Sequence, residues 1–513
     1  MIDQLALLPG YLTAHLQLTL LALFIGVAFS VPAGVLVTRV GWLEQPVLGV
    51  ASVIQTVPSL ALLAIMVPTL AALGLQSIGY LPAIIGLTLY SLLPILRNTV
   101  TGLAGVDPAL IEAARGVGMT PRQRLWRVEL PLAMPIIIAG IRTSTVLTVG
   151  VATLSTPVGA TSLGNYIFSG LQTRNFSAVI VGCVAAAGLA LVLDALIRGL
   201  STGLQERRRP LVAATTAALL LVGVLAAAPL VAGAWRQQTT PVRIGAKTFT
   251  EQYILSEIIA GLVNRETGRP VETIQSLGST VAFDALHGGQ IDVYVDYSGT
   301  LWATILRREV AALDRREVLE DVGGALEQDY GVDQVGALGF ENTYALAVRE
   351  ADADARGLMR ISDVIPYARS MAFGSDYEFF GRPEWAALRS AYGLEFAELR
   401  SMDASLMYQA VAQGDVDIIS AFSTDGRIEV FDLRVLEDDR GAIPPYDAVV
   451  LARPGLAADL PDVRAALDRL VGTIDATDMR RMNLAVDEGN RTAGDVARDF
   501  VDGLLGTPGS DDP

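Results

Sequence analysis

The stretch Glu112-Ala113-Ala114-Arg115-Gly116-Val117-Gly118, followed after nine residues by Val128-Glu129-Leu130-Pro131, decides how this chain is organised. It is a polar, arginine-bearing segment between two long apolar runs. Its Glu-Ala-Ala opening favours a helix, and its second glycine permits a tight turn. Leu-Pro then leads into the next apolar run. Such a segment is hard to explain as an ordinary loop.

The composition indicates a membrane part joined to a water-soluble part. The mean hydropathy is +0.44 and 51% of the residues are hydrophobic, which is too apolar for a wholly soluble chain of 513 residues. Residues 1–240 carry 7 acidic and 13 basic side chains, whereas residues 241–513 carry 47 and 25. The acidity of the second part argues against a nucleic-acid partner.

The first part contains six apolar runs that approach or exceed the roughly 20 residues needed to cross a bilayer. They lie near residues 15–38, 46–73, 78–100, 132–155, 177–200 and 210–234. Met1–Leu12 has neither the basic start nor the cleavage site of a signal peptide. We therefore expect a transmembrane helix to carry the following domain out of the cytoplasm.

Arginine placement predicts the orientation of these runs. Arg39, the cluster from Arg115 to Arg127, and Arg198 with Arg207–Arg209 follow runs one, three and five, whereas Arg174 alone lies in the loops of the other side. Because positive charge favours cytoplasmic loops, the N-terminus is expected outside and residues 112–131 inside. Asp194 and Arg198, four residues apart, are expected to form a helix-surface ion pair.

The Glu-Ala-Ala segment resembles the EAA loop of ABC-importer permeases, with Val128 in place of the usual isoleucine. In that family the loop is a short cytoplasmic helix pair that docks on a separate ATPase subunit. The resemblance implies that coupling to the ATPase uses Glu112, Ala113, Ala114, Gly118, Leu130 and Pro131. The alternative is an amphipathic interfacial loop without that role.

From Val242 onward, short apolar strands alternate with amphipathic helices, which favours an α/β domain. The helix–turn–strand phrase at 288–295 recurs at 413–419. Two such phrases suggest two similar lobes that close around a ligand by a hinge.

Several phrases of this half resemble the binding proteins of glycine-betaine and choline importers. They are Gly245–Gln252, Asp296–Thr300, Glu341–Leu346, Ser423–Arg427 and Pro444–Asp447. The resemblance covers nearly all of 242–505 and implies an extracytoplasmic type II periplasmic-binding-protein fold. With the permease half, it implies an all-α type I ABC permease domain at 1–205, an extra membrane helix and tether at 206–240, and the binding domain at 241–513.

Aromatic rings are the expected cation site. A quaternary ammonium donates no hydrogen bond, so aromatic faces hold it best. The positions that match the family's aromatic box are Tyr297, Tyr344, Phe422 and Tyr446. The phenylalanine departs from the usual tyrosine, which puts affinity and ligand choice in doubt.

Lys247 is the only lysine of the chain, beside 37 arginines. The resemblance implies that Lys247, Arg382 and Thr300 hold a ligand carboxylate through charge-assisted hydrogen bonds. Since choline has no anion of its own to offset Lys and Arg, the pair favours a zwitterion such as glycine betaine. Gln252 either adds a polar contact to the ligand or caps and solvates the first helix.

No enzyme motif accompanies these features. The chain shows no P-loop, nucleophile elbow or histidine metal pair, and Cys183 is alone. No catalytic residue, metal or cofactor is expected, and the ATPase must be another chain.

We therefore expect a multi-pass subunit of a bacterial cytoplasmic membrane, surrounded by lipid, which pairs with a second copy and two ATPase subunits. Its ligand is expected to be glycine betaine, with choline, carnitine and proline betaine as alternatives. A membrane-anchored ligand sensor is the alternative from another class.

Overall fold

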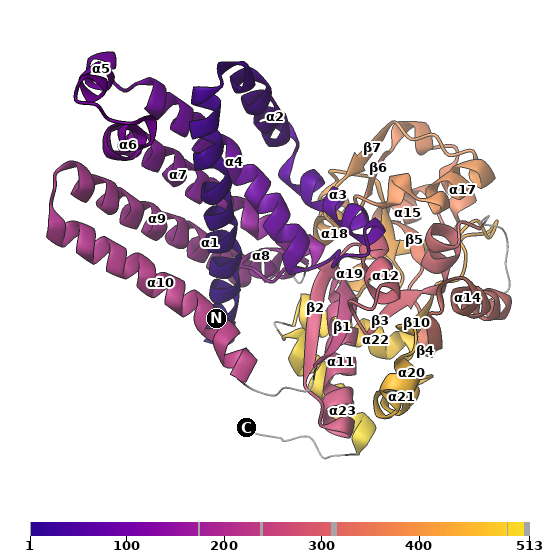
Figure 1. The fold of residues 1–513 in the computed structure, drawn as a ribbon. Coiled ribbons are helices and arrows are strands. Elements are labelled where there is room, and N and C mark those ends of the chain that lie inside the picture. Colours follow the sequence, from indigo (N-terminus) through magenta and orange to yellow (C-terminus); the bar gives the residue numbers. More distant parts are fainter. Residues whose placement is uncertain (1, 173–174, 236–239, 309–314, 490, 507–513) are drawn as a thin grey trace. The chain divides into compact units, whose positions relative to one another are not determined.

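A computed structural model describes residues 2–172, 175–235, 240–308, 315–489 and 491–506. The chain forms two compact units that divide near residue 238. The first unit is helical and the second contains both sheets (Figure 1). Part of the predicted tether, residues 236–239, lies outside the described residues.

The helices of the first unit follow the predicted apolar runs. Among the described residues, five helices are long and apolar enough to cross a membrane, and one bent pair would make a sixth span. The helices are α1 (Ile2–Arg39), α2 (Glu44–Thr56), α3 (Ser59–Ala72), α4 (Tyr80–Ala104), α5 (Pro108–Gly116), α6 (Pro121–Arg124), α7 (Leu130–Ala152), α8 (Gly164–Gln172), α9 (Phe176–Gln205) and α10 (Arg209–Trp235).

The predicted run 46–73 is not one straight helix. The 3-10 turn and α2 (Gly41–Thr56) meet α3 at 98°. Val57 is extended there because the ring of Pro58 excludes the helical conformation from the preceding residue. Tyr90 on α4 donates its hydroxyl hydrogen to the Val57 carbonyl, which satisfies a group that the break releases. The run is therefore broken at this proline, and the bent pair together is long and apolar enough to count as one span.

A stripe of small residues lets α1 approach α4 closely. A Cβ atom at Gly26 would lie 2.0 Å from the Ser91 hydroxyl oxygen, and one at Gly34 would lie 2.6 Å from the Thr99 methyl group. Ser30, midway between the two glycines, donates to the Leu92 carbonyl. Small residues four apart are a common means of packing membrane helices.

The second unit has two lobes, each built on a five-stranded mixed sheet. The first lobe has strand order β2-β1-β3-β10-β4 and the second has β7-β6-β8-β5-β9. In each, the strands alternate with helices, as predicted. The first lobe's strands are β1 (Val242–Lys247), β2 (Val271–Leu277), β3 (Val293–Tyr297), β4 (Asp333–Glu341) and β10 (Asp447–Ala452). The second lobe's strands are β5 (Tyr344–Arg349), β6 (Ala372–Ser375), β7 (Glu398–Ser401), β8 (Ile418–Phe422) and β9 (Leu433–Leu436).

Helices cover both sheets, so the central strands are buried on both faces. Every residue of β3 and of β10 is buried, as in strands packed on both sides. The longer helices are α11 (Thr250–Thr267), α12 (Ser279–His287), α14 (Arg315–Tyr330), α17 (Pro383–Tyr392), α18 (Ala404–Gln413), α21 (Pro461–Asp468), α22 (Ala476–Asp487) and α23 (Ala493–Leu505).

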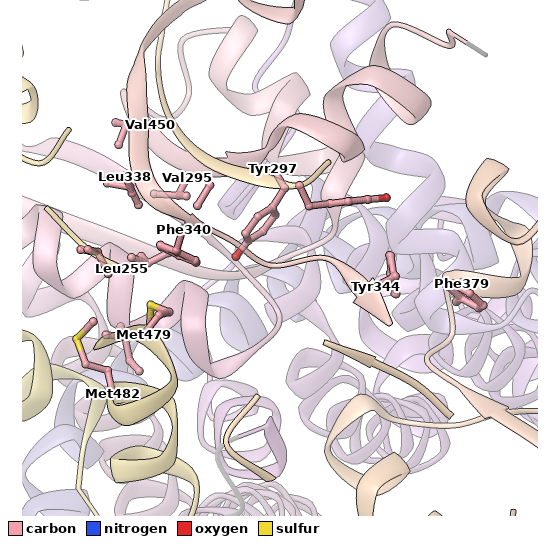
Figure 2. Close-up of a cluster of buried hydrophobic side chains, with 14 of the residues drawn as sticks. Leu255, Val295, Tyr297, Leu338, Phe340, Tyr344, Phe379, Val450, Met479 and Met482 are labelled. Carbon is pink, nitrogen blue, oxygen red and sulfur yellow. The ribbon is translucent and has the colours of Figure 1, made fainter. Parts of the chain in front are cut away.

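One hydrophobic cluster runs from the first lobe into the second. It joins the core around Val295 and Phe340 to Tyr297, Tyr344 and Phe379. Figure 2 shows these side chains in one view, with Tyr297 between the first-lobe core and Tyr344. Three of the predicted ligand-binding rings (Tyr297, Tyr344 and Tyr446) belong to this cluster, and Phe422 packs against it.

Candidate functional site

The sheets bring the four predicted aromatic residues together at strand ends. Tyr297 ends β3 and Phe422 ends β8, while Tyr344 begins β5. Tyr344 pairs directly with Phe422 across β5 and β8. Tyr446 immediately precedes β10, whose Ala448 pairs with Tyr297. The site therefore takes two rings from each lobe.

The rings form a connected group. The ring centroid of Tyr344 lies 5.2 Å from that of Phe422 and 5.9 Å from that of Tyr446. Phe249 stacks on Phe422 at 5.8 Å and on Tyr297 at 6.1 Å, and so joins the fourth ring to the others. These are ordinary aromatic contact distances.

A small cavity lies beside one of the four rings. It is lined by Phe249 and Phe422 together with Glu251 and Thr424, and it measures about 20 Å³. That volume holds about one water molecule. Tyr297, Tyr344 and Tyr446 do not line it.

Lys247 lies beside the rings with its charge already paired. Its ammonium nitrogen forms a buried ion pair with Asp296 and sits 5.2 Å from the centre of the Tyr297 ring. Gln252 is buried: its side-chain nitrogen donates to the Tyr297 hydroxyl at 3.0 Å and its oxygen accepts the Lys247 N–H at 3.3 Å. Solvation of α11 is therefore not the role of Gln252.

Arg382 of the second lobe contacts Thr300 of the first lobe. The Arg382 Nη2 atom donates to the Thr300 hydroxyl at 3.1 Å. The guanidinium lies 5.4 Å from the centre of the Tyr344 ring. It also pairs with Glu384 at 3.1 Å and with Glu378 at 3.2 Å.

These ion pairs correct one expectation about charge. We expected Lys247 and Arg382 to repel choline, because choline carries no anion of its own to offset them. Within the protein, Asp296 and Glu384 already offset the two charges, and both carboxylates are fully buried. Charge repulsion alone therefore does not exclude choline from the site.

The tyrosines of the site remain neutral phenols. Burial raises the pKa values of Tyr297, Tyr344 and Tyr446 well above the ordinary value of 10. The Tyr297 hydroxyl can therefore donate a hydrogen bond to Glu251 at 2.6 Å, and the Tyr446 hydroxyl can donate one to Glu384. These hydrogen bonds hold the hydroxyl ends of the two rings in place.

Gly299 allows the Tyr446 ring to lie against the first turn after β3. A Cβ atom at this position would lie 2.5–2.7 Å from three ring carbons of Tyr446.

We expect Gly299→Ala to lower the unfolding free energy by about 1–3 kcal/mol, because the ring must shift in a packed site. Thermal unfolding measures the change. Gly324→Ala, on α14 with open space around it, should instead stabilise slightly; equal effects of the two changes would contradict the contact.

The Glu-Ala-Ala segment forms two short helices. Asp107 caps α5 by accepting the Ala109 N–H at 2.8 Å, and Thr120 with Gln123 forms a capping box on α6. Gly118 has φ +78°, which favours glycine. The exposed members of the predicted set are Glu112, Ala113, Gly118 and Pro131, whereas Ala114 and Leu130 are buried.

The end of this segment is tied to two other elements. A π-helical turn, Leu125–Glu129, leads into α7. The buried Glu129 pairs with Arg124 at 2.6 Å and with Arg39 at the end of α1. Leu130 packs against Leu103 of α4. The segment is therefore anchored on the membrane helices rather than free.

Asp194 holds two arginines. Arg198 lies 2.6 Å away, so the predicted ion pair is confirmed. Arg142 on α7 also binds the same carboxylate through two hydrogen bonds of 2.9 and 3.1 Å. Sequence spacing could not reveal this partner, which is 52 residues away.

Comparison with known proteins covers both units. Residues 26–210 match the family described as the inner membrane component of binding-protein-dependent transport systems. Residues 240–503 match the substrate-binding domain of the ABC-type glycine betaine transport system. The chain belongs to the ABC importers whose permease and glycine-betaine-type binding domains are fused.

Two relatives agree with this assignment. This importer subunit is 30% identical to the ergothioneine transport permease/ergothioneine binding protein of Helicobacter pylori, over 94% of its own length and 87% of that protein. It is 46% identical to the choline transport system permease of Bacillus subtilis, over 35% of its length and 80% of that protein. A crystal structure titled glycine betaine/carnitine/choline ABC transporter aligns with a TM-score of 0.45 and 27% identity, over 52% of this chain and 98% of that one.

Sequence reasoning missed several residues of the candidate site. Phe249 lies two residues after Lys247 in the phrase Gly245–Gln252, where its aromatic ring could have been noted. Glu384 lies two residues after Arg382, so sequence spacing could have suggested their ion pair. Asp296 and Glu251 have no such local signal, because Lys247 is 49 residues from Asp296 and the donors to Glu251 are 46 or more residues away.

Proposed function

We propose that this subunit captures a zwitterionic quaternary-ammonium solute, glycine betaine in the first place, and forms half of its ATP-driven translocation pathway. The observation that carries the proposal is the group of aromatic rings at the meeting of the lobes, beside the Arg382–Thr300 contact. Aromatic faces attract a diffuse cation that cannot donate hydrogen bonds. The arginine and the hydroxyl group would bind a carboxylate at the other end of the same solute.

The ion pair of Lys247 changes which residues we expect to bind the ligand carboxylate first. Lys247 would contribute to carboxylate binding only by exchanging Asp296 for the ligand. Thr300 needs no such exchange, since its hydroxyl can turn from Arg382 toward the ligand. We therefore assign the first carboxylate contact to Thr300 and Arg382.

Ergothioneine is a second candidate ligand. The relative in Helicobacter pylori, aligned over nearly the whole chain, is an ergothioneine transporter and binding protein by its name. Ergothioneine also carries a trimethylammonium group and a carboxylate, so it fits the same two contacts. Proline betaine and carnitine share this chemistry, whereas choline has a hydroxyl group instead of the carboxylate.

The proposed assembly contains two copies of this chain and two ATPase subunits, in a bacterial inner membrane. Six spans with one EAA loop make half of a translocator. Residues 112–131 would dock on the ATPase in the cytoplasm, and the binding domain would work on the opposite side. Solute would close the lobes, and ATP-driven closure of the ATPases would move the docked helices. A short tether would keep the binding domain at an effective concentration on the order of mM.

Isothermal titration of the full chain in detergent tests the ligand site. Glycine betaine, ergothioneine and choline are titrated into the unaltered chain and into Tyr344→Leu. Leucine keeps an apolar side chain but removes the aromatic face, so we expect binding of every ligand to weaken about 30-fold, corresponding to about 2 kcal/mol of cation–π attraction. Thr300→Val should weaken only the carboxylate ligands, by about tenfold.

The matched control is Tyr367→Leu. Tyr367 lies in the second lobe, where its ring contacts Arg356. It packs against the same hydrophobic cluster, but among the described residues no aromatic pair joins it to the four rings. Its replacement should leave all three affinities unchanged within about twofold. Tight glycine betaine binding that Thr300→Val does not affect would keep the aromatic site and discard the carboxylate contact. Failure of all three ligands to bind would contradict the proposed ligand class.

A further inference from the structure

Glu251 is a buried carboxylate at the meeting of the two lobes. It lies in the first turn of α11, and 2% of the residue is exposed. Its Oε1 atom accepts hydrogen bonds from the Tyr297 hydroxyl at 2.6 Å and the Asn342 amide at 2.9 Å. Its Oε2 atom accepts from the Thr424 hydroxyl at 2.5 Å and the Asn483 amide at 3.1 Å.

The four donors come from four different parts of the binding domain. Tyr297 ends β3 and Asn483 lies on α22, both in the first lobe. Asn342 lies between β4 and β5, where the chain crosses between lobes. Thr424 follows β8 in the second lobe. One carboxylate therefore bonds an aromatic ring of the ligand site, the crossing segment and the opposite lobe.

Glu251 differs from the other buried carboxylates near the site. Asp296 pairs with Lys247 and Glu384 pairs with Arg382. Among the described residues, Glu251 has no cationic partner and accepts only from neutral donors. Burial raises its pKa, and the four hydrogen bonds oppose that rise. The buried Glu251 carboxylate therefore depends on all four donors for its hydrogen bonds. The hydrogen bond from Thr424 exists only while the lobes are together.

A second contact between the lobes lies beside it. Asp487 at the end of α22 accepts from the Thr250 hydroxyl at 2.6 Å and lies 3.8 Å from the Arg427 guanidinium of the second lobe. Glu251, Asp487 and Arg427 line the same cavity of about 20 Å³. Glu251 is thus placed in the contact surface between the lobes and not merely near it.

We propose that Glu251 is a positioning residue that couples closing of the lobes to the placement of the Tyr297 ring. Thr424 and Tyr297 bind opposite oxygens of one rigid carboxylate. When Thr424 bonds Oε2, the carboxylate plane is fixed, and the acceptor for the Tyr297 hydroxyl is fixed with it. The inference rests on the proposed function, because it assigns the ring to the ligand site.

A double-mutant cycle tests the coupling in the full chain. Tyr297→Phe and Thr424→Val each remove one hydroxyl that bonds Glu251. Each change alone is expected to weaken glycine betaine binding about fivefold. If the two hydroxyl groups acted independently, their losses of affinity would multiply to about 25-fold. We expect the affinity of the double variant for glycine betaine to fall by no more than about tenfold. Once one hydroxyl is gone, the other can no longer position the Tyr297 ring through Glu251.

Two matched controls separate coupling from general damage. Ser423→Ala removes the neighbouring hydroxyl, which bonds the backbone at Thr343 and Glu341 rather than Glu251, and it should combine additively with Tyr297→Phe. Glu257 lies on the same helix and accepts only from Thr273 and Gln275 of the first lobe. Glu257→Gln should change affinity less than about twofold, whereas Glu251→Gln should weaken it about tenfold, since it removes one of the two acceptor oxygens.

An additive Tyr297–Thr424 cycle, or equal effects of Glu251→Gln and Glu257→Gln, would overturn the inference. If the unaltered chain binds none of the three solutes, the proposed function fails first. In that case the thermal unfolding temperatures of the unaltered chain, the two single variants and the double variant are measured instead. Non-additive shifts would still support coupling of Tyr297 to Thr424 through Glu251, and additive shifts would refute it.

Discussion

Replacing Glu384 by alanine is expected to lower the free energy of unfolding of the binding domain by about 3–5 kcal/mol. Glu384 has no exposed surface, and it holds both the Arg382 guanidinium and the Tyr446 hydroxyl. Its removal leaves a buried cation with only the half-exposed Glu378 as a carboxylate partner. Even the lower limit corresponds to a fall of about 6–12 °C in the unfolding temperature.

The control for this prediction is an exposed pair of the same chemistry. Glu398 pairs with Arg400 on the surface of the second lobe, with side chains 52% and 44% exposed. Glu398→Ala should lower the unfolding temperature far less than Glu384→Ala does, because water screens the lost interaction. Equal shifts for the two variants, measured by scanning calorimetry, would show that Glu384 does not hold the arginine in the folded protein.

Reversing the charge of Glu112 is expected to reduce ATP-driven import by about tenfold or more while leaving solute binding unchanged. Glu112 and Ala113 lie on the exposed side of α5, so Glu112→Lys does not disturb the core. A reversed charge at a docking surface costs several kcal/mol of partner binding, and 1.4 kcal/mol already corresponds to tenfold. Solute uptake into cells measures import, and titration of the purified chain measures binding.

Glu206→Lys is the matched control for the docking surface. Glu206 is also an exposed acid between two membrane helices, and it pairs with Arg208. It lies outside residues 112–131, so its reversal should leave import unchanged within about twofold. Loss of import in both variants would indicate a general effect of charge, and unchanged import in Glu112→Lys would exclude this residue from coupling.

The sequence predicted those features that local pattern determines. The apolar runs matched helices because apolar length is a local property, and the Glu-Ala-Ala segment formed a helix pair with a left-handed glycine at 118. The break at Pro58 was visible in the sequence. Its 98° bend depends in part on Tyr90, a residue of another helix, and could not be read from the run itself.

The long-range polar contacts of the candidate site depend on the tertiary fold. The Lys247–Asp296 ion pair joins residues 49 apart, and the Tyr446–Glu384 hydrogen bond joins residues 62 apart. Their meeting requires the order of strands in each sheet and the approach of one lobe to the other. A positive charge in the sequence therefore indicated a possible carboxylate contact but not whether that charge was already neutralised.

Uptake by reconstituted vesicles tests the central claim most directly. The full chain and its ATPase subunit are placed in liposomes, and radiolabelled glycine betaine and ergothioneine are offered on the side of the binding domain. An importer predicts accumulation of at least one solute that requires ATP and is lost in Tyr344→Leu. Binding of the solute without ATP-dependent accumulation would contradict this account and support a membrane-anchored sensor instead.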